Sequence, residues 1–144
     1  MDASTVLPDL SPQCRKVLDV LSHAVRPLSA YDVLGQLRES GIKSPPTIYR
    51  ALEKLTAEGW VHRIESLNAY VACSHKHHHA THGCCNHVGQ FAICTDCGAV
   101  RELESPVLTN ALSSTHDRFL ARVDRKVIEL FGVCHNCIKA GAPV

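Results

Sequence analysis

The 144-residue sequence predicts an α+β fold, in which a helical N-terminal half ends in a β-hairpin and a smaller mixed half follows. Three observations support this prediction: apolar residues recur at helical spacing in the first half, short strand-like segments follow them, and two C-x2-C pairs lie in the second half. The hydrophobic content of 45% and charged content of 20% are typical of a soluble globular protein. A chain of this length buries about 68–70% of its unfolded surface, so it can fold without a covalent cross-link.

Each of the three expected N-terminal helices has a start signal and a stop signal. The first follows Ser11-Pro12, a cap with a proline at the first helical position, and should stop at Pro27. The second runs from a cap at Ser29 to Gly41, and the third occupies residues 44–59, from a serine followed by two prolines to a terminal glycine. Their apolar faces have helical spacing and comprise Cys14, Val17, Leu18, Leu21, Val33, Leu34, Leu37, Ile48, Leu52 and Leu55.

Two strand-like segments follow the helices, Trp60–Glu65 and Ala69–Cys73, separated by the hairpin signal Ser66-Leu67-Asn68. Three helices and a hairpin form the pattern of a winged helix-turn-helix domain. A small helical bundle with a protruding hairpin is the alternative. In either case the third helix directs a polar face outward, formed by Tyr49, Arg50, Glu53 and Lys54.

The second half predicts a small α/β unit. Val88–Cys94 and Gly98–Leu103 resemble strands around a tight turn, and Arg122–Phe131 resembles a third. Ser105-Pro106 opens a helix whose expected face comprises Leu108, Ala111, Leu112, Thr115 and Phe119. The predicted organisation is therefore a domain at residues 1–73, a His/Cys-rich hinge segment at 74–87 and an α/β domain at 88–144.

Charge and cysteine content limit the classes of function. The net charge is +1, so DNA binding would have to come from a local patch rather than from bulk charge. The N-terminus lacks the features of a signal peptide, and no apolar run approaches the ~18 residues of a membrane span. We therefore expect a cytoplasmic protein without a membrane partner. Eight cysteines in a reducing compartment indicate metal or redox chemistry rather than disulfides.

Two C-x2-C pairs, "CTDC" and "CHNC", supply four thiolates, which fit the tetrahedral shell of a structural zinc. One such pair could be a thioredoxin-like redox site. A second pair at the end of the same domain instead favours closure around one metal. The predicted structural zinc ligands are Cys94, Cys97, Cys134 and Cys137.

A second group of possible ligands surrounds the segment "SHKHHHATHGCCNH" at residues 74–87, which holds six of the ten histidines. His62, Cys73, His87 and Glu102 would make an acceptable mixed zinc set, although spacing alone does not single them out. The interior of the segment is interpreted as an accessory zinc collector or a plain linker, since neutral imidazoles bind zinc weakly and reversibly. Its possible accessory ligands are His75, His77, His78, His79, His82, Cys84 and Cys85.

Four blocks of sequence, "SAYDVLGQLR", "PPTIYRALEKL", "GWVHRIESLNAYVAC" and "FAICTDCGAV", resemble the ferric uptake regulator (Fur) superfamily, and in detail its zinc uptake regulator (Zur) branch. The resemblance extends from about Ser11 to Cys137. It implies a winged-helix DNA-binding domain joined to an α/β dimerisation domain. It also implies a structural zinc on the four C-x2-C cysteines, a regulatory zinc on His62, Cys73, His87 and Glu102, and DNA contacts from Tyr31 and Arg50.

The chain departs from the resemblance at several positions. "RPLS", with Pro27, replaces a region where iron-sensing members have a histidine, and Ala72 replaces a glutamate beside Cys73. The softer ligand set that results favours zinc over iron or manganese. Arg125 and Lys126 stand where some relatives have a histidine for a further metal, so we expect that site to be missing. The histidine-rich insertion departs from the pattern too, and it leaves His82, Cys84 or Cys85 as substitutes for His87.

The leading hypothesis is a zinc-responsive transcriptional repressor of zinc-uptake genes. It would act as a homodimer on a palindromic double-stranded DNA operator, with two zinc ions per protomer, one structural and one regulatory. The expected DNA-contacting residues are Tyr31, Thr47, Tyr49, Arg50 and Lys54. The alternatives are a zinc buffer or carrier and a Fur-family regulator of another divalent metal. An enzyme is not expected, because a catalytic zinc keeps an open position and the sequence has no H-E-x-x-H-like motif.

Overall fold

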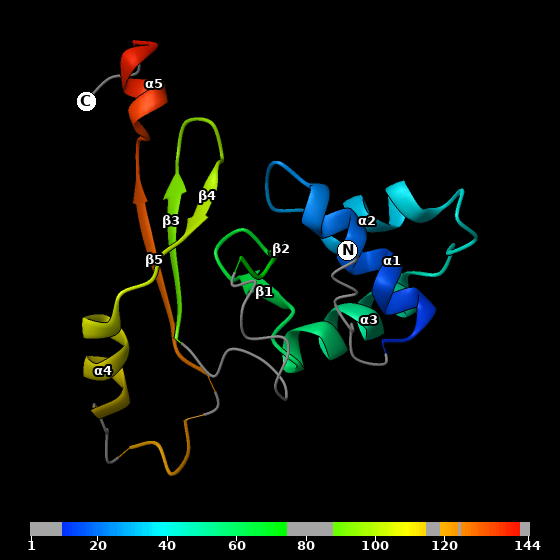
Figure 1. Ribbon diagram of the computed structural model, residues 1–144, viewed down its shortest axis with the longest axis horizontal. Coiled ribbons are helices and arrows are strands. Elements are labelled where there is room, and N and C mark those ends of the chain that lie inside the picture. The colour runs from blue at the N-terminus through cyan, green and yellow to red at the C-terminus, as the bar shows by residue number, and fades with distance from the viewer. Residues whose placement is uncertain (1–9, 75–87, 115–118, 124, 142–144) are drawn as a thin grey trace, which may run out of the picture. The chain divides into compact units, whose positions relative to one another are not determined.

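The computed structural model describes residues 10–74, 88–114, 119–123 and 125–141 (Figure 1). The chain divides into two compact units, residues 1–85 and 86–144. The first contains helices and a hairpin, and the second contains a small sheet with two helices, so the predicted α+β class is confirmed. The assignment of functional domains to 1–73, 74–87 and 88–144 stays a prediction.

The first unit contains three helices whose beginnings match the sequence signals: α1 (Pro12–His23), α2 (Ala30–Leu37) and α3 (Pro45–Ala57). At α1 the Cys14 backbone N–H donates to Ser11 Oγ at 3.3 Å. At α2 the pair Ser29 and Asp32 forms a reciprocal capping box, with N···O distances of 3.1 and 2.9 Å. Hydrogen bonds from the Ser29 side chain, and then from its backbone, lower the pKa of Asp32. The starts of α1 and α2 are thus fixed by side-chain caps, whereas Ser44 makes no cap hydrogen bond and α3 begins at Pro45 and Pro46.

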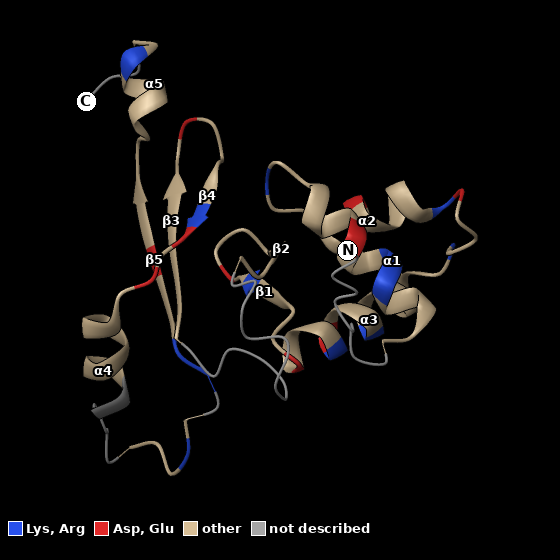
Figure 2. Ribbon diagram, viewed as in Figure 1, with Lys and Arg blue, Asp and Glu red and all other residues tan. Residues whose placement is uncertain are grey.

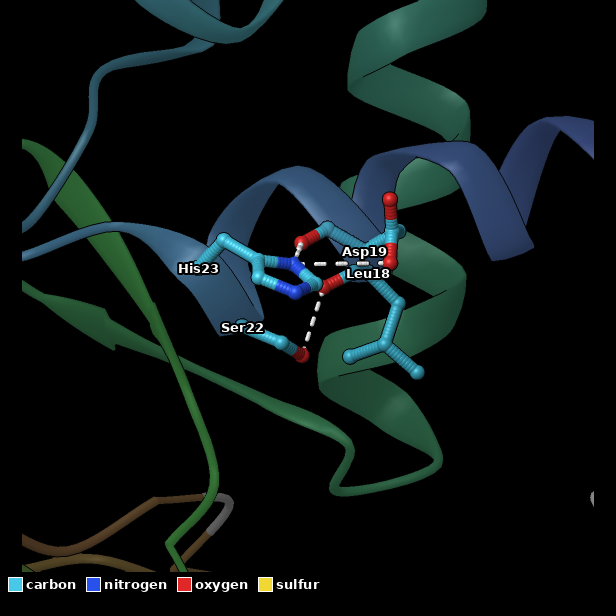
Figure 3. Close-up of polar contacts among 4 residues, drawn as sticks. All are labelled: Leu18, Asp19, Ser22 and His23. Atoms are coloured by element: carbon cyan, nitrogen blue, oxygen red, sulfur yellow. Dashed lines mark hydrogen bonds and ion pairs between the residues drawn. The ribbon is translucent and has the colours of Figure 1, made fainter.

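The end of α1 lies at His23, so the expected stop at Pro27 is wrong by several residues. Polar side chains of its last turn bond to its own carbonyls (Figure 3): Ser22 Oγ donates to the Leu18 oxygen at 2.7 Å, and His23 Nδ1 lies 2.8 Å from the Asp19 oxygen. Ala24 then takes an extended conformation. Further along, Leu28 pairs with Tyr70 through backbone hydrogen bonds of 3.1 and 2.8 Å, so the chain has left the helix before the proline in order to reach this partner.

Gly59 follows the end of α3 as the sequence predicted, whereas α2 ends at Leu37 and Gly41 closes the turn after it. Gly41 has φ +91° and Gly59 has φ +75°, conformations that glycine adopts without strain. The amide after each glycine closes a 6→1 hydrogen bond, Ile42 to the Leu37 oxygen at 3.3 Å and Trp60 to the Leu55 oxygen at 2.9 Å. The helices pack on one core, which comprises Leu10, Cys14, Val17, Leu21, Ala30, Val33, Leu34, Leu37, Ile42, Ile48, Ala51, Leu52, Leu55, Trp60 and Val61.

The predicted hairpin is formed by β1 (Val61–Ile64) and β2 (Ala69–Ala72), which pair antiparallel with His62 opposite Val71. Asn68 turns the chain with φ 47° and accepts a 2.8 Å hydrogen bond from Arg63 Nη2. Three helices followed by a hairpin constitute a winged helix-turn-helix architecture.

The second unit contains a three-stranded sheet in the order β4-β3-β5, with bounds β3 (Gly89–Cys94), β4 (Val100–Glu102) and β5 (Val127–Gly132). β3 pairs antiparallel with β4 and parallel with β5, and α4 (Pro106–Ser114) lies in the crossover that a parallel pair requires. The buried Gln90 of β3 holds α4 by donating to Ser105 O at 3.2 Å and to Thr109 Oγ1 at 2.9 Å.

Three predictions for the second unit are wrong in detail. The strand expected at Arg122–Phe131 begins only at Val127, because pairing with β3 begins there. α4 is described over Pro106–Ser114 and Phe119 lies in a turn, so the expected helical face does not extend to Phe119. Thr115 lies outside the described residues. The short helix α5 (His135–Lys139) was not predicted. In the part of the chain that the structure describes, no helix is long and apolar enough to cross a membrane.

Candidate metal centre and nucleic-acid interface

The sheet of the second unit brings the two C-x2-C pairs to one place. Cys94 is the last residue of β3 and Cys97 lies in the turn after it, while Cys134 caps α5 and Cys137 lies within that helix. The parallel register aligns Cys94 with Gly132, two residues before Cys134. The pairs therefore meet because β3 and β5 run side by side and end together.

The four sulfur atoms have the spacing of a tetrahedral site. Cys94 Sγ lies 3.9 Å from Cys137 Sγ, Cys97 Sγ lies 3.9 Å from Cys134 Sγ, and all four lie within 4.8 Å of one another. Zn–S bonds of about 2.3 Å in a tetrahedron place the sulfurs about 3.8 Å apart. The donor set and its dimensions thus fit zinc, and the structure brings together all four cysteines that the spacing had grouped.

The polypeptide around the cluster favours negative charge on one sulfur. Hydrogen bonds from the backbone of Cys97, and then of Cys134, lower the pKa of Cys94 to about 6, and the Cys134 backbone nitrogen lies 3.3 Å from the Cys94 sulfur. Hydrogen bonding involving the Asp96 side chain, and then Cys134, raises the pKa of Cys137. A divalent metal bound by the cluster would stabilise the thiolate forms of its ligands. Asp96 was missed by sequence reasoning, although a carboxylate between two ligand cysteines is a usable signal.

Two predicted regulatory ligands lie in the hairpin of the first unit. His62 is in β1 and Cys73 follows β2, where its N–H donates to the Trp60 oxygen at 2.9 Å. A ligand nitrogen of His62 lies within 4.8 Å of Cys73 Sγ, and both residues are half-buried. Glu102, also half-buried, ends β4 in the second unit. His87 lies outside the described residues, as do the accessory candidates His75, His77, His78, His79, His82, Cys84 and Cys85.

The predicted DNA-contacting residues lie on helices α2 and α3. Tyr31 is 66% exposed in the first turn of α2, and Tyr49 is 45% exposed on α3 beside the exposed Arg50. Thr47, in the first turn of α3, is half-buried. Lys54 is exposed and forms a 3.9 Å ion pair with Glu58. Figure 2 shows both signs of charge on α3, so this surface is not a purely basic patch.

The buried side of α3 explains why its other side is available to a partner. Ile48, Leu52 and Leu55 are fully buried at 0% exposure, and they fix the rotation of the helix about its axis. Tyr49 and Arg50 must then face away from the core. The first unit thus presents an aromatic and a guanidinium group on a rigid helix.

Comparison with known proteins identifies the chain's relatives. A model of the ferric uptake regulator family matches residues 9–126, and the chain belongs to this family. It is 36% identical over 134 residues to the zinc uptake regulation protein of Escherichia coli K12, covering 92% of this chain and 75% of the relative. It is 29% identical over 140 residues to the ferric uptake regulation protein of Bacillus subtilis 168, covering 89% of this chain and 84% of the relative.

Solved structures of zinc uptake regulators have a similar fold. A zinc uptake regulator complexed with zinc and DNA matches with a TM-score of 0.80 at 34% identity, covering 93% of this chain and 86% of that one. The holo form of XcZur matches with a TM-score of 0.75 at 35% identity, covering 90% and 86%. The family resemblance predicted from the sequence is therefore confirmed. The names of these relatives are those of regulators rather than enzymes.

Proposed function

We propose that the protein is a zinc-responsive, DNA-binding transcriptional repressor, in which zinc favours the operator-competent dimer and thereby represses zinc-uptake genes. The observation that carries this proposal is the similarity, across 93% of the chain, to a regulator solved with both zinc and DNA. The exposed face of α3 and the four-cysteine cluster provide independent physical support, because a zinc buffer would not require a rigid helix with exposed Tyr49 and Arg50.

The first of two zinc ions per protomer is assigned to Cys94, Cys97, Cys134 and Cys137. The sulfur spacing of 3.9 Å in both measured pairs supports this assignment. Four protein ligands leave no open position, which is typical of structural rather than catalytic zinc. Since two of the ligands belong to β3 and its turn and two to the segment after β5, the metal joins the ends of these strands, and its binding energy contributes to folding.

The second, regulatory zinc is assigned to His62, Cys73, His87 and Glu102. The proximity of His62 to Cys73 in the hairpin supports the first half of this set. A thiolate, imidazoles and one carboxylate suit zinc better than iron or manganese. The other two ligands belong to the hinge segment and to β4, so a zinc ion held by all four would restrict the orientation of the hairpin. Zinc would then stabilise DNA binding to the extent that it prefers the competent orientation.

DNA recognition is assigned to α3, with Arg50 as the main base-reading residue. A guanidinium on an exposed helix can donate two hydrogen bonds to guanine in the major groove. Thr47, Tyr49 and Lys54 would contact the flanking backbone or bases, and Tyr31 would contact the backbone from the start of α2.

Homodimer formation is assigned to the second unit. β5 pairs with β3 on one side within the described residues, and it carries Leu130 and Phe131, which are 51% and 56% exposed. These residues also line a cavity of about 530 Å³. An apolar edge strand is a natural site for pairing with a second copy. A two-fold dimer would place two recognition helices about 34–36 Å apart on a palindromic operator.

The proposal is tested by selecting duplexes from a random-sequence pool with the zinc-loaded protein and titrating the recovered DNA in gel shifts. We expect a two-fold symmetric site whose binding is lost on chelation and restored by zinc. Arg15→Ala, an exposed arginine of α1 rather than of α2 or α3, serves as the control for Arg50→Ala. Failure to enrich any duplex would favour the zinc buffer. Better restoration by Fe²⁺ or Mn²⁺ than by Zn²⁺ would favour the regulator of another metal.

A further inference from the structure

The four-cysteine cluster consists of one shielded pair and one accessible pair. Cys94 and Cys137 are 5% and 9% exposed, and their sulfurs lie 3.9 Å apart. Cys97 is exposed and Cys134 half-buried, with the same 3.9 Å between their sulfurs. A soluble reagent therefore reaches Cys97 first, and Cys134 is a sulfur close enough to react with it next.

A backbone hydrogen bond adds to this asymmetry. The Cys134 amide donates to the buried sulfur of Cys94 at 3.3 Å, so this sulfur is both shielded and in contact with a backbone donor. Cys97 lies instead in the β3–β4 turn, between the exposed Asp96 and Gly98, whose φ is +73°. The difference in exposure thus directs an oxidant to Cys97.

We propose that Cys97 and Cys134 form an oxidation site through which peroxides release the zinc of the four-cysteine centre. The inference rests on the proposed structural zinc, because Cys97 and Cys134 are two of its four ligands and their oxidation would remove both. The regulator would then respond to oxidant as well as to zinc.

The reaction has two steps that balance. The Cys97 thiolate attacks one oxygen of hydrogen peroxide, the O–O bond breaks, and Cys97 sulfenic acid and hydroxide form. The Cys134 thiolate then attacks the sulfenic sulfur, the S–O bond breaks, hydroxide leaves, and the Cys97–Cys134 disulfide forms. Two thiolates lose two electrons to one peroxide. Zinc, left with two of its four ligands, dissociates, and a dithiol reductant with added zinc reverses the change.

The sulfurs must approach from 3.9 Å to about 2.05 Å for this bond to form. Cys97 belongs to a turn and Cys134 to the position before α5, so neither lies within a strand of the sheet. The new bond would link the turn after β3 to the segment after β5. The shielded Cys94 and Cys137 would remain as thiols.

The test uses the full-length protein, reduced and zinc-loaded. The zinc that survives mild chelation is counted first, and hydrogen peroxide is then added in substoichiometric steps. Zinc release is followed with a chromogenic chelator. Cysteines are alkylated with one reagent before reduction and another after it, and the peptides are mapped by mass spectrometry.

We expect one zinc released per peroxide consumed, a Cys97–Cys134 disulfide as the first product, and full recovery of zinc after dithiothreitol and zinc are added. The Cys73→Ser variant should release this zinc in the same way, because Cys73 belongs to the other unit. The disulfide is mapped in the unsubstituted protein, so the test requires no variant of the four-cysteine cluster.

Two kinds of failure are distinguishable. If no zinc survives mild chelation, the proposed structural zinc is wrong. If that zinc is present, two results overturn only the present inference. One is that zinc is retained while peroxide oxidises other residues. The other is that the first disulfide joins Cys94 to Cys137, or the two cysteines of a single C-x2-C pair.

Discussion

Replacing Gly35 and Gly41 by alanine should change the stability of the first unit in opposite directions. Gly35 lies within α2 and Gly41 follows that helix with φ +91°. At both positions an added methyl group would meet no neighbouring atom within 4 Å. Steric contacts therefore do not distinguish the two substitutions. The backbone conformation alone decides whether each one raises or lowers the stability of the first unit.

The expected magnitudes follow from backbone energetics. Gly35→Ala should stabilise the unit by about 0.5–1 kcal/mol, the usual difference between these residues inside a helix. Gly41→Ala places a Cβ in the left-handed region, at a cost of about 1–2 kcal/mol. Reduced freedom of the unfolded chain offsets about 0.4–1 kcal/mol of that cost. The net loss is about 0.5–1 kcal/mol, so the two variants should differ by roughly 1–2 kcal/mol.

Trp60 provides the assay. It is the only tryptophan of the chain, is 7% exposed and belongs to the core on which α2 packs, so its fluorescence reports unfolding of the first unit. With a urea m-value of about 1 kcal/mol/M, the midpoint should rise by about 0.5–1 M in Gly35→Ala and fall by a similar amount in Gly41→Ala. A midpoint for Gly41→Ala at or above the unsubstituted value, or a lower one for Gly35→Ala, would refute the reasoning.

Three substitutions test the sites. Cys137→Ser should lose the tightly held zinc and destabilise the second unit, as measured by metal analysis and size-exclusion chromatography; a dimer with unchanged melting temperature would contradict the assignment. Arg50→Ala should weaken operator binding by roughly 10- to 100-fold, corresponding to about 1–3 kcal/mol, without changing zinc content. An unchanged affinity for the operator in gel shifts would show that residues other than Arg50 read the DNA sequence. Cys73→Ser should leave a folded dimer whose DNA affinity no longer rises with zinc, and a full zinc response in fluorescence anisotropy would eliminate Cys73 as a sensor ligand.

The first unit could be predicted from sequence because its signals are local. The capping box of Ser29 and Asp32 and the terminal glycines Gly41 and Gly59 act within a few residues of the helix ends that they define. The apolar spacing then fixes which face is buried. The end of α1 is the exception, since the chain leaves the helix to pair Leu28 with Tyr70, a partner that is distant in the sequence.

The second unit was less predictable because its elements depend on distant partners. β5 begins at Val127, where Gly89 of β3 becomes available for pairing, and nothing in the residues before Val127 marks that point. The five-residue helix α5 is too short to show a period. Its position follows instead from Cys134 and Cys137, which must turn toward Cys94.

The two metal sites also differ in how far the sequence predicts them. Two C-x2-C pairs within one unit suggest a shared metal from spacing alone, but the cross-pairing of Cys94 with Cys137 and of Cys97 with Cys134 emerges only from the parallel alignment of β3 and β5. His62, Cys73, His87 and Glu102 are each ordinary in isolation. Family resemblance, rather than spacing, selected them.

The two proposed zinc sites differ in what their binding energy can do. All four ligands of the cysteine site belong to the second unit, so zinc there stabilises a fold and has no direct means of selecting an orientation of the first unit. The proposed regulatory set takes His62 and Cys73 from the hairpin and Glu102 from the second unit, so of the two zinc ions this is the one that can couple metal binding directly to the orientation of the first unit. Because such coupling is reciprocal, saturating operator DNA should tighten the regulatory zinc by the same factor by which zinc tightens the operator, typically about 5- to 150-fold. Competition with a zinc chelator of known affinity, with and without operator, measures that factor. The regulatory zinc could instead show the same affinity with and without operator, while DNA binding still requires zinc. That result would mean that the cysteine-site zinc, not the regulatory zinc, is coupled to DNA binding.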